Sequence, residues 1–104
     1  MNRVANPARG EAEVLVNNAA LLLRPTFAAL VAAEQELGPL FALVERAAAG
    51  QLLLTEMVAL FWHCRFDAPA EVSRDMFSEA VAANGLAAAT PALKIVLGQI
   101  LGGQ

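Results

Sequence analysis

Residues 11–30 read EAEVLVNNAALLLRPTFAAL and join two strand-like segments to the start of a helix. The asparagine pair at 17–18 separates the two segments, and asparagine tolerates the positive φ angles that a tight turn requires. In the first segment Val14 and Val16 share one face, as expected of a half-buried strand. Three consecutive leucines in the second segment blur this alternation. The stretch therefore predicts a β-hairpin over residues 11–24.

Beyond the hairpin, apolar residues recur at spacings of three and four, which is the periodicity of amphipathic helices. Prolines, glycines and polar caps interrupt these runs and mark where each helix begins and ends. Thr55 is predicted to cap the third helix and Thr90-Pro91 to begin the fifth, because threonine accepts a backbone hydrogen bond and proline suits the first helical turn. The predicted helices span about residues 26–37, 39–49, 55–66, 70–83 and 90–101.

Strands at one end of the chain and helices in the rest predict an α+β domain, mainly α, with the helices packed over a small sheet. A chain of 104 residues suits one domain with one hydrophobic core. We assign that domain to residues 11–102, a flexible leader to residues 1–10, and a short tail to residues 103–104.

Composition narrows the classes of partner. The net charge is −3 and the seven basic residues are scattered, so the chain has no electrostatic footprint for nucleic acid. The single cysteine excludes an internal disulfide, and no apolar run reaches the roughly 18 residues of a membrane-spanning helix. We therefore expect a cytoplasmic protein that binds neither nucleic acid nor membranes. Hydrophobic residues make up 58% of the chain, which leaves apolar helix faces poorly covered and predicts self-association.

The sequence contains no recognisable cluster of reactive residues. His63 and Cys64 are adjacent on a predicted helix, where neighbours point about 100° apart and cannot readily share a metal or form a nucleophile and base. Glu71, Asp75 and Glu79 recur every four residues and could hold a cation, although a solvated helix face is the simpler interpretation. We therefore expect no enzyme activity, no cofactor and no metal site.

The last predicted helix carries the widest apolar face in the chain, and an amphipathic helix in a groove is a common mode of protein recognition. Trp62 follows Phe61, so one ring can enter the core while the other anchors a partner. Burial of both rings in the core is the alternative. The candidate partner-binding residues are Trp62, Leu93, Val96, Leu97, Ile100 and Leu101.

Four short stretches, distributed over most of the chain, match the pattern of a known family. They are Arg9-Gly10-Glu11, LRPTFAAL at residues 23–30, EQELG at residues 34–38, and Asn84-Gly85-Leu86. Together they resemble the small tail-assembly chaperone family of siphophages and of phage-like gene transfer agents. The asparagine pair at 17–18 departs from the family, whose hairpin turn is expected to contain glycine.

The resemblance implies an assembly factor of a prophage or gene transfer agent, encoded near the tail-tube and tape-measure genes. Such a factor holds the aggregation-prone tape-measure protein soluble until tail-tube subunits polymerise around it, and it has no catalytic centre. The implied partners are therefore the tape-measure protein and the tail-tube protein. Two alternatives stay open: a minor structural tail component that is retained in the particle, and a small hydrolase or metal enzyme that uses His63 and Cys64.

Overall fold

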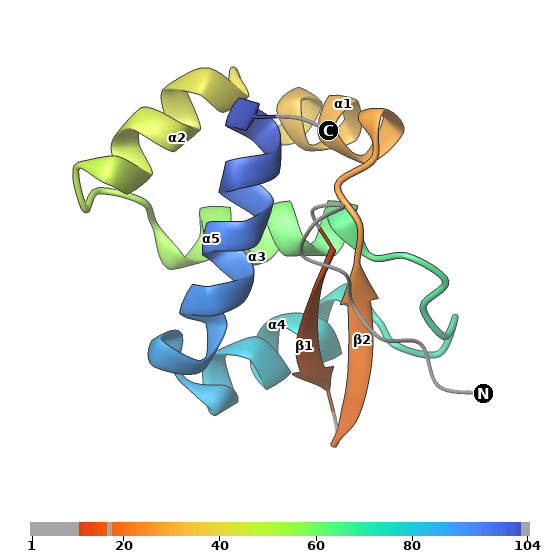
Figure 1. Ribbon diagram of the computed structural model, residues 1–104. Helices are drawn as coiled ribbons and strands as arrows, with labels where there is room; N and C mark the ends of the chain where they lie inside the picture. The colour runs from red at the N-terminus through yellow and green to blue at the C-terminus, as the bar shows by residue number, and fades with distance from the viewer. Residues whose placement is uncertain (1–10, 17, 103–104) are drawn as a thin grey trace.

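An antiparallel hairpin and five helices make up residues 11–16 and 18–102, which are the residues described by the computed structural model (Figure 1). The predicted α+β class, a hairpin followed by helices, is confirmed. The predicted leader, the predicted tail and Asn17 lie outside the described residues. The elements are β1 (Ala12–Val16), β2 (Ala19–Leu23), α1 (Phe27–Leu37), α2 (Leu40–Ala48), α3 (Leu54–Cys64), α4 (Arg74–Asn84) and α5 (Leu86–Gly102).

The two strands of the hairpin pair on either side of residues 17–18, where the sequence predicts the turn. Ala12 lies opposite Leu23, and Val16 opposite Ala19. Asn18 has a φ of 66°, the left-handed conformation that a tight turn requires. Val14 and Val16 are both buried, so the alternating face of β1 points into the core.

The backbone that follows α3 continues the sheet at the outer edge of β2. The N–H of Arg24 donates to the carbonyl of Cys64 at 2.7 Å, and the N–H of Phe66 donates to the carbonyl of Leu22 at 3.0 Å. Both faces of β2 are covered, because the leucines at 21–23 are all buried. This burial on both faces accounts for the lost alternation in the second strand.

Helices α1 and α2 follow the sequence prediction to within one residue at each end. Thr26 caps α1, and its hydroxyl oxygen accepts a hydrogen bond from the N–H of Ala29 at 3.1 Å. Gly38 and Gly50, with φ of 84° and 74°, follow the ends of α1 and α2 in the left-handed conformation. Local sequence signals are thus sufficient for this pair of helices.

The third and fourth helices begin at positions that differ from the prediction. Helix α3 starts one residue before Thr55, with Leu53 at the cap position, and Glu56 turns back to accept from the Leu53 N–H at 3.0 Å. Helix α4 starts at Arg74 and not near residue 70, because the hydroxyl of Ser73 caps it by accepting from the Met76 N–H. Glu56 at the start of α3 and Ser73 at the start of α4 therefore supply the capping hydrogen bonds of these two helices.

Helix α3 ends at Cys64, two residues before its predicted end. Arg65 forms an isolated bridge with Leu23, so its backbone leaves the helix to join the edge of β2. A long-range strand contact ends this helix, and the local apolar periodicity does not contain that information.

The fifth helix begins at Leu86, four residues before the predicted cap at Thr90. Thr90 does not cap; its hydroxyl donates to the carbonyl of Leu86 at 2.9 Å inside the helix. Pro91 consequently lies in the helix interior. Gly85, with φ of 90°, lets the chain enter α5 directly from α4, and burial of Ala89 stabilises the additional first turn.

The core lies between the hairpin and the helices, and α3 contributes most to it. The consecutive residues 57–61 of α3 are all buried, and α1 and α4 pack against this helix. Helices α4 and α5 pack on β1 (Figure 1). The largest side chains with no exposed surface include Phe61, Phe77, Leu60 and Leu43.

In the described part of the chain, no single helix is long and apolar enough to cross a membrane. The pairs α1–α2 and α4–α5 meet the length and composition criteria only as pairs, and they are bent by 77° and 113°.

Candidate partner-binding surface

An apolar groove lies where α1, α2 and the last turns of α5 meet. Figure 1 shows α5 running from the α4 corner to the space beside α1 and α2. The groove has a volume of about 320 Å³. We call it the apolar groove, and it is lined by Phe27, Leu30, Val31, Glu34, Leu40, Phe41, Ile100 and Leu101.

The helical period and one elbow place these side chains together. Phe27, Leu30, Val31 and Glu34 have spacings of three and four, so they form one stripe along α1. The chain then bends by 77° between α1 and α2. After this bend Leu40 enters the core while its neighbour Phe41 points outward.

Glu34 closes the elbow between the two helices. Its Oε2 accepts a hydrogen bond from the N–H of Leu40 at 3.1 Å. Pro39 occupies the cap position of α2 and supplies no side-chain hydrogen bond, so the Glu34 carboxylate satisfies a donor that the helix terminus leaves open. The polar group of the apolar groove therefore also holds its two walls together.

The phenylalanines of the apolar groove are unusually accessible. Phe27 is 84% exposed and Phe41 is 70% exposed, and Leu101 beside them is 59% exposed. Single exposed apolar side chains are common in soluble proteins, but a contiguous exposed patch marks a binding surface. The three side chains come from three different helices that share one groove, so they form such a patch.

The candidate residues on the last helix do not all lie at the surface of the groove. Ile100 and Leu101 line the apolar groove. Leu93 and Leu97 are partly buried and pack against the core. Val96 is completely buried, so its side chain belongs to the core and not to the surface.

Phe27 and Phe41 were missed as binding candidates. Phe27 fits the apolar period of its helix, which predicts a core position, yet it is the first residue of α1 and its side chain is exposed. Phe41 is out of phase with the buried Leu40, Leu43 and Val44. A large aromatic residue outside the buried stripe of an amphipathic helix is the signal that could have identified it.

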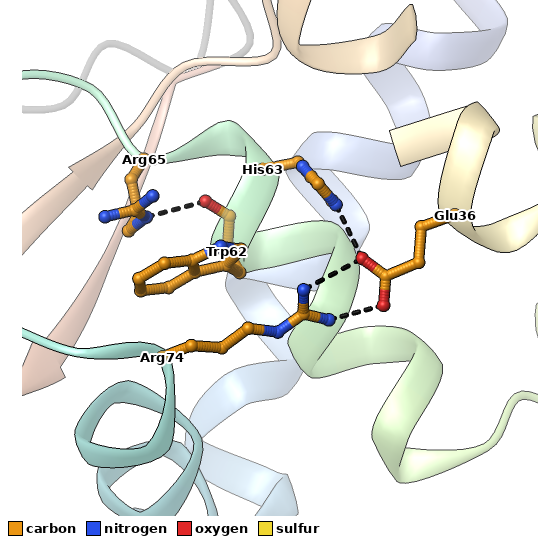
Figure 2. Close-up of polar contacts among 5 residues, drawn as sticks. All are labelled: Glu36, Trp62, His63, Arg65 and Arg74. Atoms are coloured by element: carbon orange, nitrogen blue, oxygen red, sulfur yellow. Dashed lines mark hydrogen bonds and ion pairs between the residues drawn. The ribbon is translucent and has the colours of Figure 1, made fainter. Parts of the chain in front are cut away.

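Trp62 does not line the apolar groove; it lies beside Arg65 (Figure 2) and also contacts Phe77. Its ring meets Phe77 edge to face, with centroids 5.7 Å apart. The Arg65 guanidinium lies 3.2 Å from the Trp62 ring centroid, and Arg65 Nε donates to the Trp62 carbonyl at 2.7 Å. Trp62 is partly buried between these two neighbours, while Phe61 is fully buried.

Glu36 joins three helices beside this cluster. Arg74 of α4 donates from Nη1 and Nη2 to the two oxygens of the Glu36 carboxylate, and His63 Nε2 of α3 lies 2.7 Å from Oε1 (Figure 2). The hydrogen bonds from Arg74, followed by the one with His63, lower the pKa of Glu36 to about 2. The same carboxylate raises the pKa of Arg74. The arrangement joins α1 to α3 and α4.

The reactive residue types do not converge. Cys64 is completely buried, and burial raises the pKa of its thiol to about 12. Glu71 precedes α4, so the predicted row with Asp75 and Glu79 is not one helix face. Among residues 11–16 and 18–102, no group of three or more His, Cys, Asp and Glu side chains is placed to hold a metal ion.

Comparison with known proteins identifies a family. No curated protein and no solved structure matches the chain. A family model described as "Phage tail tube protein, GTA-gp10" matches residues 9–103, which is nearly the whole chain. The match includes every element of the fold and every residue of the apolar groove. The chain therefore belongs to this family and is a tail protein of phages or of phage-like gene transfer agents.

Proposed function

We propose that this tail protein is an assembly chaperone that holds the tape-measure protein soluble through the apolar groove while the tail tube is built. The observation that carries the proposal is the exposure of Phe27 and Phe41 on the two walls of one groove. Exposed aromatic rings at the centre of a concave apolar surface are typical anchors for a protein partner.

The chemistry of the described residues agrees with a binding role. The thiol of Cys64 is buried with a raised pKa, and His63 lies against the Glu36 carboxylate. Neither residue faces the apolar groove, where Glu34 is the one charged residue among the lining side chains. We therefore propose a non-catalytic protein that acts in the cytoplasm of the host cell before the tail is complete.

A structural role in the finished tail is the second candidate, because the family description names the tail tube itself. Mass spectrometry of purified particles separates the two roles. A signal stoichiometric with other tail proteins would support a retained component. Absence from particles, together with co-purification with the tape-measure protein from lysate, would support the chaperone.

Self-association stays a prediction, and the exposed rings of Phe27 and Phe41 provide a surface for it. We expect it to be weak and to appear only at high protein concentration. Light scattering over a concentration series measures it, and replacement of Phe41 by serine should reduce it.

Co-expression with the tape-measure protein tests the proposed function. The tape-measure protein should be largely insoluble alone, and it should become soluble and co-purify when the wild-type chain is present. A double variant with Phe27→Ser and Phe41→Ser should lose this effect, because it removes the anchors of the apolar groove. Both residues are exposed, so the variant should fold normally.

The matched control is the double variant Leu53→Ser and Leu86→Ser. These leucines are 61% and 58% exposed, but neither lines the apolar groove. The control should therefore keep the tape-measure protein soluble. Insolubility of the tape-measure protein in the presence of the wild-type chain would refute the chaperone role.

A further inference from the structure

We infer that the apolar groove takes one amphipathic helix from its partner, with the apolar face of that helix between Phe27 and Phe41 and a lysine or arginine at Glu34. The inference rests on the proposed function, since it names the kind of tape-measure segment that is bound. It is carried by the shape of the groove, its exposed area and its charges.

The walls of the apolar groove favour a helix over a strand. Its lining comes from α1, α2 and α5, whose backbone groups are paired within their own helices, and both strands of the hairpin lie elsewhere. A strand would need an open sheet edge, whereas side chains on helical walls accept the apolar face of another helix. Apolar anchors at spacings of three, four and seven on such a helix would pack against Phe27, Phe41 and Leu101, which line the groove.

The exposed area is too small for a stable pair of identical chains. With about 150–250 Å² for a fully exposed phenylalanine, the rings and their apolar neighbours present on the order of 500 Å². A stable dimer buries about 800 Å² on each partner. A single helix covers a smaller patch, so a helix fits the apolar groove better than a second copy of this chain.

The charges around the apolar groove favour a basic segment. Glu34 lines it, and Glu45 is exposed one turn after Phe41. Lys94 lies about two turns before Leu101 on α5 and is the basic residue on that helix. Glu34 lies at the groove itself, so a cation on the incoming helix would be attracted and a carboxylate would be repelled. The net charge of −3 also disfavours a second copy.

Two synthetic peptides provide the test. Each has about 18 residues, or five helical turns, and the same leucine face. One carries lysines and the other glutamates on its polar face. Fluorescence anisotropy with the full-length chain measures their affinities, and circular dichroism reports whether the bound peptide is helical. The basic peptide should bind as a helix and the acidic one at least tenfold more weakly.

Three variants connect this binding to the apolar groove. Phe41→Ser should lower the affinity for the basic peptide roughly tenfold, as expected for loss of a central anchor. Glu34→Gln keeps an oxygen for the Leu40 N–H but removes the charge. It should lower the affinity for the basic peptide about two- to fivefold in low salt. Glu79→Gln, an exposed change of the same charge on α4, is the control and should leave affinity unchanged.

The outcomes separate this inference from the proposed function. Equal binding of both peptides, no binding, or binding that Phe41→Ser leaves intact would overturn the helix inference. So would a stable dimer at micromolar concentration that Phe41→Ser dissociates, because a second copy would then fill the groove. If the tape-measure protein is solubilised but Phe27→Ser and Phe41→Ser have no effect, the chaperone role stands, whereas the apolar groove is not its binding surface and the helix inference is wrong. If the basic peptide binds as expected but the tape-measure protein stays insoluble, the chaperone role is wrong.

Discussion

The carboxylate of Glu11 accepts hydrogen bonds from the guanidinium of Arg24, at 2.8 Å from Nε and 2.7 Å from Nη2. Glu11 is only 2% exposed, and Arg24 also stacks over the Phe66 ring at 4.1 Å. Glu11 and Arg24, which belong to two of the stretches that carry the family resemblance, therefore meet in space. Their contact fixes the junction between the hairpin and α1.

Replacement of Arg24 by alanine should lower the free energy of unfolding by about 2 kcal/mol. The buried carboxylate of Glu11 would lose its guanidinium partner, and breaking a buried pair costs about 3–5 kcal/mol when both groups are inaccessible. The value is reduced here because the Arg24 side chain is 32% exposed. Urea unfolding measures the loss. The double variant Glu11→Leu with Arg24→Leu should recover part of it, and a loss below about 0.5 kcal/mol in the alanine variant would show that the pair is not stabilising.

Glu36 should contribute to stability above about pH 5, and the contribution should disappear as the pH falls toward 2. Its pKa is lowered in the folded state from 4.5 to about 2, mainly by Arg74, so the unfolded chain takes up the proton first. Glu36→Gln should therefore lower stability near neutral pH and flatten the acid dependence. The carboxylate is 39% exposed, so the loss should be at most about 1 kcal/mol.

Urea unfolding of the wild type and of Glu36→Gln across the acidic pH range measures the difference in their free energies of unfolding. Glu79→Gln serves as the charge-matched control, because Glu79 is exposed on α4. Parallel stability curves for wild type and Glu36→Gln at every pH would contradict the role assigned to the contact with His63 and Arg74.

Cys64 should resist thiol reagents in the folded protein. Its side chain is completely buried, and burial raises its pKa to about 12, so little thiolate is available for attack. A chromogenic disulfide reagent at mildly alkaline pH should label it only after denaturant is added. Rapid stoichiometric labelling of the native chain would mean that α3 opens easily or that the thiol is accessible.

Replacement of Pro91 by alanine should raise the free energy of unfolding by about 1–2 kcal/mol. Proline in a helix interior costs about 3 kcal/mol, and the stiffening of the unfolded chain offsets part of this cost. Pro91 is exposed within α5, so alanine can supply the missing N–H without a loss of packing. Thermal unfolding measures the change, and Pro39→Ala at the cap of α2 is the control without a gain. Destabilisation by Pro91→Ala would instead support a helix that begins at Thr90.

Much of the candidate site could not be predicted from the sequence, for reasons that particular residues show. Leu101 and Ile100 were recognised because they end a long apolar face. Phe41 lies next to the buried Leu40 on the same helix. Only the bend between α1 and α2 determines which of the two side chains points outward. The burial of Val96 depends on how α5 packs, and helical spacing alone does not distinguish it from Leu97.

Local signals in the sequence account for the hairpin and for the number and order of the helices in the described residues. These features depend on turn, cap and periodicity signals within a few residues of one another. The start of α5 depends on packing between elements, and so does the contact of Glu36 with His63 and Arg74, which lie 27 and 38 positions away along the chain. Tertiary packing also places Phe27 beside Phe41 and Leu101 in one groove. Local signals cannot specify these contacts, because they form only when the helices pack around a shared core.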